Sequence, residues 1–477
     1  MMLRVSTLAL LVLGLAALTT TLPGEVPCCE LRYAVRPDPA ARAVDVRLEI
    51  VGFEGDSLVL ERPSDRPLVG LLNQDPRVEG TRGAEWTLID GSPRWTFRRP
   101  DGGWDRTIEV TYRLAITAER PLNAWSPGLD DDLLYAPAEA LFLVPDMPGL
   151  SARHAPVAVR WSLPNGWDAF TGWPGPRFYG VRTLLKTNVL AGRIHRRVAS
   201  ACGFRIEVGA HVGWEFDADP LAENLARLAC VARGRLGEPR SDRYAVTLVQ
   251  ARFPVTSGNR NGPQTIGFVH SVPDSTPPSI RLLAHELVHL WQRYDAPAWF
   301  QEGVNDYMAL RLAHEAGLLS DEAYAGHLSA IDSAYRAHPN RDTWSFADEH
   351  REGLEFGSSD GRLAYRKGAV VGLALDRELR LRTGGRADLS TLWREMNARA
   401  RWGQVAWSDV DIASRSAALA GGSLEVFFDR FVGGTDPMPP PGALLANLPP
   451  PPPPKGNDGA SGALAAFLQT AVSRIAE

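Results

Sequence analysis

Two histidines and two glutamates between positions 280 and 302 constrain this chain most, because together they would fix two separate helices to one ion. Apolar side chains follow the i, i+3, i+4, i+7 spacing of an amphipathic helix at Ile280, Leu283, Ala284, Leu287, Val288 and Trp291. His285 and His289 lie outside this stripe and one turn apart, so both imidazoles can face the same ion. Glu286 is rotated by about 100° from His285, where it can reach a water on that ion. This is the HExxH arrangement, and the alternative is a surface helix with two solvated histidines.

The segment after this helix supplies a third ligand. Glu302 follows His289 by 13 residues, at the start of a further predicted helix. Its carboxylate would complete a His₂Glu set and leave a fourth position for water, as in catalytic zinc sites. Asp306 lies one turn beyond Glu302 and can accept the free ring N–H of a ligand histidine. We therefore predict a single Zn²⁺ ion held by His285, His289 and Glu302.

The predicted ligand set implies hydrolysis. Zinc lowers the pKa of water towards 7 and polarises a carbonyl group. Glu286 would take the proton of the attacking water and pass it to the leaving amine. The reaction also needs a donor for the developing oxyanion, which these residues do not supply.

The order of hydrophobic patterns predicts an α+β multidomain protein. Residues 30–175 contain several runs of alternating apolar and polar side chains, such as Val44–Ile50, which predict an N-terminal antiparallel β domain. Residues 180–320 mix strands with helices and contain the zinc helix, so we expect the catalytic domain there. Helical patterns continue through 321–436 as an α-helical domain, and a proline-rich tail with a short terminal helix spans 437–477.

The first residues of the chain predict export. A basic start at Arg4 precedes an apolar run of 11 residues, Leu8–Leu18, which has the length of a signal-peptide core and is short for a membrane span. We expect residues 1–24 to be a signal peptide or an uncleaved N-terminal anchor, with a buried N-terminal helix as the alternative. No second long apolar run follows, so we expect no further membrane span. The protein would then be periplasmic, secreted or anchored on the outer side of a membrane.

Cysteine usage fits an oxidising compartment. The four cysteines are Cys28, Cys29, Cys202 and Cys230, and four cysteines allow three pairings. We favour the pair Cys202–Cys230. Neither couple has the CxxC spacing of a zinc ribbon, so the pattern does not favour such a site. The formal net charge of −5 gives no reason to expect a nucleic-acid partner.

Several motifs resemble known zinc peptidases. HELVH followed by WFQEGVNDY is similar to the gluzincin clan of zinc metallopeptidases. The segment Ala364–Val371 and the LD…R…TGG pattern that ends at Gly385 look like the YxKG helix and its ending in the glycyl aminopeptidase family. In that family the tyrosine of the motif stabilises the oxyanion, which implies this role for Tyr365. The resemblance extends from Leu31 to Leu448 and implies a β domain, a thermolysin-like catalytic domain, an α-helical domain and a peptide or protein substrate.

Two departures from the family concern substrate choice. The family usually ends in a PDZ domain, and the residues after Leu448 are too few for one, so we expect none. The family also has a GGLEH-like strand whose glutamate helps to hold the substrate's amino terminus. The nearest match is Ile266–His270, with Val269 at the glutamate position. As a secondary prediction, Gly267, Phe268, Val269 and His270 contact substrate on an edge strand that pairs with an extended peptide.

The sequence therefore predicts a zinc metallopeptidase that acts as an aminopeptidase or as an endopeptidase on short peptides. Two alternatives stay open: a zinc hydrolase of another amide or ester, and a binding protein that retains zinc without turnover. Glu286 and Tyr365 argue against the binding protein, because neither residue is needed merely to hold the ion.

Overall fold

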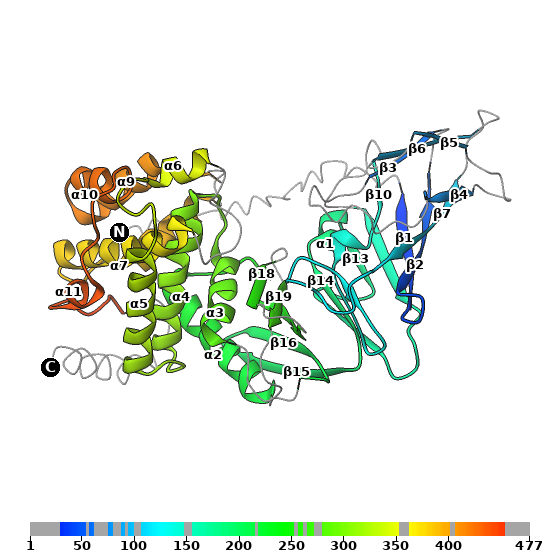
Figure 1. The fold of residues 1–477 in the computed structure, drawn as a ribbon, viewed down its shortest axis with the longest axis horizontal. Helices are drawn as coiled ribbons and strands as arrows, with labels where there is room; N and C mark the ends of the chain where they lie inside the picture. The colour runs from blue at the N-terminus through cyan, green and yellow to red at the C-terminus, as the bar shows by residue number, and fades with distance from the viewer. Residues whose placement is uncertain are drawn as a thin grey trace, which may run out of the picture.

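The computed structural model describes residues 29–53, 57–61, 75–79, 87–90, 94–99, 106–146, 155–214, 218–251, 256–260, 265–270, 279–352, 362–400 and 406–453. The predicted signal peptide or anchor at 1–24 and the predicted terminal helix of the tail lie outside these segments. Within them, no helix is both long enough and apolar enough to cross a membrane. Figure 1 shows a β-rich part in blue to cyan at one end, a central sheet in green, and helices in yellow to red at the other end.

Two sheets form most of the N-terminal β region. The six-stranded sheet has the order β13 (Arg177–Tyr179), β11 (Pro156–Trp161), β1 (Glu30–Asp38), β2 (Ala43–Val51), β7 (Thr107–Ala115) and β4 (Arg77–Glu79). The four-stranded sheet has the order β10 (Val144–Pro145), β3 (Ser57–Glu61), β6 (Arg94–Arg98) and β5 (Thr87–Asp90). Alternate side chains of β1, β2 and β7 are buried, as the sequence pattern predicts. The expectation of an antiparallel domain is wrong at one pair, because β1 and β11 run parallel with Leu31 opposite Val157.

A third sheet extends the β region beyond the predicted boundary at residue 175. Its order is β12 (Asp168–Thr171), β14 (Asn188–Gly192), β9 (Leu133–Pro137) and β8 (Gly128–Leu129). The short helices η2 (Ala138–Ala140) and α1 (Val181–Leu185) lie between its strands in the sequence. Since β14 pairs with β9 and β12, the β region continues to Gly192.

The central five-stranded sheet has the order β15 (Ile194–Ala201), β16 (Phe204–His211), β17 (Arg243–Gln250), β19 (Thr265–His270) and β18 (Thr256–Arg260). The middle three strands are parallel, and each outer strand is antiparallel to its neighbour. One face packs on α2 (Ala218–Leu236) and α3 (Ile280–Val288) through residues such as Val246, and the other packs on the third sheet through residues such as Val249. The predicted disulfide Cys202–Cys230 is confirmed and joins the β15–β16 turn to α2.

The remaining helices continue the same hydrophobic core. They are η3 (His289–Trp291), η4 (Trp299–Val304), α4 (Asn305–Glu315), α5 (Asp321–Arg336), α6 (Phe346–Arg351), α7 (Leu363–Thr383), α8 (Leu389–Ala400), α9 (Asp409–Ala420), α10 (Glu425–Phe431) and α11 (Pro441–Leu445). Buried apolar side chains are continuous from Ile206 in the central sheet to Leu444 in α11. The predicted units 180–320 and 321–436 therefore share one core.

The two glycines that follow Thr383 end α7. Gly384 and Gly385 have φ of 60° and 80°, which is the left-handed region where glycine carries no side-chain penalty. Their N–H groups donate to the carbonyls of Leu381 and Arg380, which closes the helix C-terminus.

A buried cluster of three arginines and three carboxylates joins α2, α4, α7 and the start of α8. Arg311 donates to Asp376 at 2.9 Å, to Asp388 at 2.6 Å and to Glu315 at 2.9 Å. The other two arginines complete the cluster, because Arg235 pairs with Glu315 at 2.6 Å and Arg380 with Asp376 at 3.3 Å. The charges balance, so each buried carboxylate has a cationic partner.

The described part of the proline-rich tail packs against these helices. Its helix α11 buries Leu444 in the core, and the carbonyl of Met438 accepts from Arg336 at 3.2 Å. The carbonyls of Pro449 and Pro452 accept from the guanidinium groups of Arg380 and Arg235.

Candidate metal centre

The predicted zinc helix has the expected geometry. Its apolar stripe faces the core, and Leu283 and Leu287 are fully buried. α3 ends at Val288 and continues as the tighter turn η3, which begins at His289. His285 and His289 therefore stay one turn apart, with rings 4.7 Å apart between centroids.

Three ligand atoms converge at one point, as the sequence predicts. The Nε2 atoms of His285 and His289 lie 3.0 Å apart, and they lie 3.2 and 3.4 Å from Oε2 of Glu302. Ligands at zinc distances of about 2.0–2.1 Å in a tetrahedron lie about 3.3 Å from one another. All three residues are buried. The spacing therefore fits three corners of a tetrahedral zinc site.

Hydrogen bonds on the far side of each ring fix the histidine tautomers. Nδ1 of His285 donates to Oδ1 of Asp306 at 2.8 Å, so the predicted contact of Asp306 is confirmed. Nδ1 of His289 donates to Oε1 of Gln292 at 2.6 Å. The amide nitrogen of Gln292 donates to the carbonyl of Gln301 at 3.0 Å, which turns its oxygen towards His289. Both Nε2 atoms consequently carry lone pairs, and two facing lone pairs beside a carboxylate require a cation between them.

The electrostatics of the cluster also favour a positive charge. Burial opposes protonation of His285, yet the carboxylates of Asp306 and Glu302 outweigh burial and raise the pKa of this ring. Burial would likewise raise the pKa of Glu302, but the two histidines hold it well below its usual range. A proton on the histidines or a metal ion can supply the required charge, and the two compete for the same Nε2 atoms.

A π-helical turn and a close contact between helices place Glu302. The turn η4 carries Glu302 into α4, and π-turns of this kind are frequent at functional sites. Gly303 packs directly on α7, where a Cβ atom on Gly303 would lie 2.3 Å from the carbonyl oxygen of Ala364. A Cβ atom on Gly368 would lie 2.6 Å from the carbonyl oxygen of Trp299. The two backbones can approach this closely only because both positions are glycine.

Tyr365 reaches the centre from the first turn of α7. Its ring lies 6.2 Å from the His285 ring between centroids. Burial, followed by the carboxylates of Glu302, Glu286 and Asp306, raises the pKa of Tyr365 far above its usual value. The phenol therefore stays protonated and can donate a hydrogen bond beside the predicted metal position. Glu286, which is also buried, lies on the helix between the two histidines.

The prediction that Gly267, Phe268, Val269 and His270 form an edge strand is wrong. β19 lies inside the sheet, with β17 on one side and β18 on the other. Val269 is fully buried against the third sheet, on the face opposite to Ile266, which packs with α3. The reason is that residues 256–260 add a further antiparallel strand outside β19, so β18 is the edge strand.

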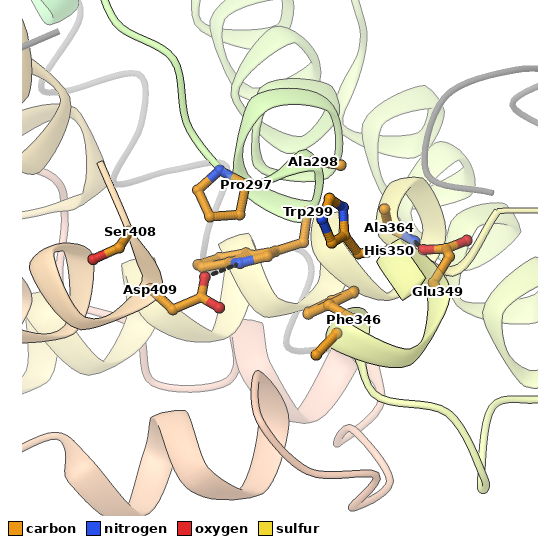
Figure 2. Close-up of a pocket in the computed structure, with 10 residues that line it drawn as sticks. Pro297, Ala298, Trp299, Phe346, Glu349, His350, Ala364, Ser408 and Asp409 are labelled. Carbon is orange, nitrogen blue, oxygen red and sulfur yellow. Dashed lines mark hydrogen bonds between the residues drawn. The ribbon is translucent and has the colours of Figure 1, made fainter. Parts of the chain in front are cut away.

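A cavity of about 320 Å³ lies next to Trp299 and Ala364, which come shortly before Glu302 and Tyr365 in the sequence. Figure 2 shows the residues that line it. Pro297, Ala298, Trp299, Phe346, Ala347, Glu349, His350, Ala364, Ser408 and Asp409 line it. Trp299 lines it and donates from Nε1 to Oδ1 of Asp409 at 2.7 Å. The sequence does not predict this cavity, because its walls come from helices that are distant in the sequence. The sequence pattern does not predict the contact of Gln292 with His289 either, although Gln292 is only three residues after His289.

Comparisons with known proteins place the fold. No protein-family model matches the sequence, and no curated protein matches it. Solved structures do match: an aminopeptidase N family protein from Idiomarina loihiensis has 17% sequence identity and a TM-score of 0.75, over 87% of this chain and 78% of that one. An M1 zinc metallopeptidase from Deinococcus radiodurans has 19% identity and a TM-score of 0.53, over 89% and 96%. The chain has the fold of M1 zinc metallopeptidases.

A mutant of the Deinococcus radiodurans enzyme has been solved with a bound Tyr-Ser-Ala substrate. It matches at 18% identity and a TM-score of 0.54, over 89% of this chain and 96% of that one. The M1 architecture accounts for the β-rich N-terminal region and the helical C-terminal region described above.

Proposed function

We propose that this protein is a zinc-dependent metallopeptidase that hydrolyses peptide bonds at the centre formed by His285, His289 and Glu302. The observation that carries the proposal is the convergence of two Nε2 lone pairs and a carboxylate, with both tautomers fixed by Asp306 and Gln292. A single bound Zn²⁺ would polarise the scissile carbonyl and lower the pKa of water towards 7.

Two side chains of the site have separate roles: Glu286 transfers protons, and Tyr365 stabilises negative charge. Glu286 takes the proton of the attacking water and delivers it to the departing amine, since it is buried on α3 directly after the ligand His285. Tyr365 donates from its neutral phenol to the oxyanion that develops on the carbonyl oxygen. The two carboxylates of Asp306 and Glu302 need no proton during the reaction.

We further propose aminopeptidase-like or short-peptide endopeptidase action, related to the glycyl aminopeptidase family. The motif around Tyr365 supports the relation. The buried Val269 weighs against recognition of a free amino terminus in the manner of that family, since an anion is needed there. We also propose export, and the disulfide Cys202–Cys230 supports an oxidising compartment.

The decisive test compares the zinc-loaded protein with its Glu286→Gln variant on matched peptides with free and acetylated amino termini. We expect hydrolysis by the unmutated protein, loss of at least about a hundredfold in kcat for the variant, and equal zinc content. Glu322→Gln is the control, because Glu322 is exposed on α5. Cleavage of only the free-amine peptides would define an aminopeptidase.

The same experiment separates the alternatives. Hydrolysis of amide or ester substrates without any peptide cleavage would favour a zinc hydrolase of another class. Tight zinc binding without turnover of any substrate would favour a binding protein and contradict the proposal.

A further inference from the structure

The first turn of α7, which carries Tyr365, is held by a carboxylate from another helix. The first N–H groups of a helix have no partner inside the helix, and the residue before α7, Arg362, provides no side-chain cap. Instead, Oε1 of Glu349 accepts from the N–H of Leu363 and Oε2 accepts from the N–H of Ala364, both at 2.7 Å. Figure 2 shows Glu349 directed at Ala364.

Glu349 is itself firmly placed. It is 2% exposed, and its helix α6 begins with a capping box in which Ser345 and Asp348 bond each other's backbone N–H groups. Phe346, in the same helix, stacks on Trp299 with ring centroids 5.7 Å apart and planes at 13°. A negative group at the start of α7 also interacts favourably with the positive end of that helix.

Tyr365 directly follows the two residues that Glu349 holds. The direction of its side chain depends on where the first turn of α7 lies. Further along the helix, the backbone contact of Gly368 with Trp299 fixes the position of α7 against the metal-ligand segment. In the first turn the carbonyl of Ala364 packs on Gly303, and Glu349 bonds two of the N–H groups that have no partner inside the helix.

We propose that Glu349 is a positioning residue, which holds the first turn of α7 so that the Tyr365 hydroxyl faces the metal centre. The inference rests on the proposed function, in which Tyr365 stabilises the oxyanion. Glu349 also lines the cavity beside Trp299, so direct binding of a substrate ammonium group is the competing role. The two roles differ in kinetics, because lost positioning lowers kcat whereas lost binding raises KM.

A double-mutant cycle in the zinc-loaded, full-length protein tests the proposal. The variants are Glu349→Gln, Tyr365→Phe and the double variant, with Glu352→Gln as control because Glu352 is exposed at the end of α6. We expect Glu349→Gln to lower kcat by roughly tenfold or more with KM within about threefold, and zinc content to be unchanged. In the Tyr365→Phe background, Glu349→Gln should have no further effect. An equal loss of kcat in that background, or a rise in KM alone, would overturn the proposal.

A second measurement does not depend on turnover. Amide hydrogen exchange of a peptide spanning 362–368 should be at least about tenfold faster in Glu349→Gln than in Glu352→Gln. Unchanged exchange would refute the anchoring role whatever the activity. If the unmutated protein hydrolyses nothing, the proposed function fails while the exchange result still decides the anchoring role. If Glu349→Gln does not fold, Glu349→Asp takes its place in both experiments, since it keeps the charge and shortens the reach.

Discussion

The acceptor that Gln292 gives to His289 can be removed with little change in volume by Gln292→Met. In the structure the His289 Nδ1 to Gln292 Oε1 distance is 2.6 Å, and Gln292 is only 2% exposed, so water cannot easily replace the lost partner. Loss of such an outer partner weakens metal binding by about 10- to 100-fold. This corresponds to about 1.4 to 2.8 kcal/mol, since each tenfold step is about 1.4 kcal/mol.

The measurement is a competition titration of the metal-free protein against a chromophoric zinc chelator at pH 7.5. Gln301→Met is the matched control, because it makes the same glutamine-to-methionine change next to Glu302 and leaves the main-chain carbonyl that holds Gln292. We expect the control to bind zinc as the unmutated protein does. If Gln292→Met also bound zinc within about twofold of the unmutated protein, the histidine orientation would not depend on this bond, and the argument from fixed tautomers would fail for His289.

Three further predictions concern stability in urea. Arg311→Met leaves one buried carboxylate of its cluster without a cation and should cost about 3 to 5 kcal/mol, and a loss below about 1 kcal/mol would contradict the assigned network. Burial, aided by Arg120, lowers the pKa of His211 to about 4, so between about pH 6.5 and 4 mainly the unfolded chain takes up this proton. The unmutated protein should therefore lose about 3 kcal/mol more than His211→Gln between pH 6.5 and 4, and equal pH profiles would refute the shift. Replacing both Cys202 and Cys230 by serine, at a sequence separation of 28, should cost about 3 to 4 kcal/mol, and an unchanged urea midpoint would count against the disulfide.

The convergence of the candidate metal ligands was predictable because their geometry is mostly local. His285 and His289 are one helical turn apart whatever surrounds them, and only Glu302 had to return from a second helix. The amphipathic stripe fixed which face of α3 is buried. The hydrogen bond from His289 to Gln292 was not predictable, because a glutamine three residues after a histidine is no recognised motif. The orientation of Gln292 also depends on the carbonyl of Gln301.

Strand order was not predictable in the same way, because pairing partners are distant in the sequence. Alternation identifies β19 as a strand, but it does not tell whether residues 256–260 pair outside it. The parallel pairing of β1 with β11 was not predictable either, since an alternating pattern does not tell in which direction a strand runs beside its neighbour. The continuous core across the predicted boundary at 320 arises because helices on both sides of it pack on one another.

Charge balance at the centre links these observations. With both histidines neutral, Glu302, Asp306 and an ionised Glu286 bring three negative charges into a buried region, and Arg281, paired with Asp306 at 2.9 Å, supplies one positive charge. An uncompensated charge of −2 in such a place is costly, and a divalent cation at the converging atoms removes it. Burial and, after it, the same carboxylates raise the pKa of Tyr365, so the group that should donate to the oxyanion keeps its proton. The ligand set, the hydrogen-bond partners of the histidines and the state of Tyr365 are therefore mutually consistent with a 2+ ion at this position, which competes with protons for the same Nε2 atoms.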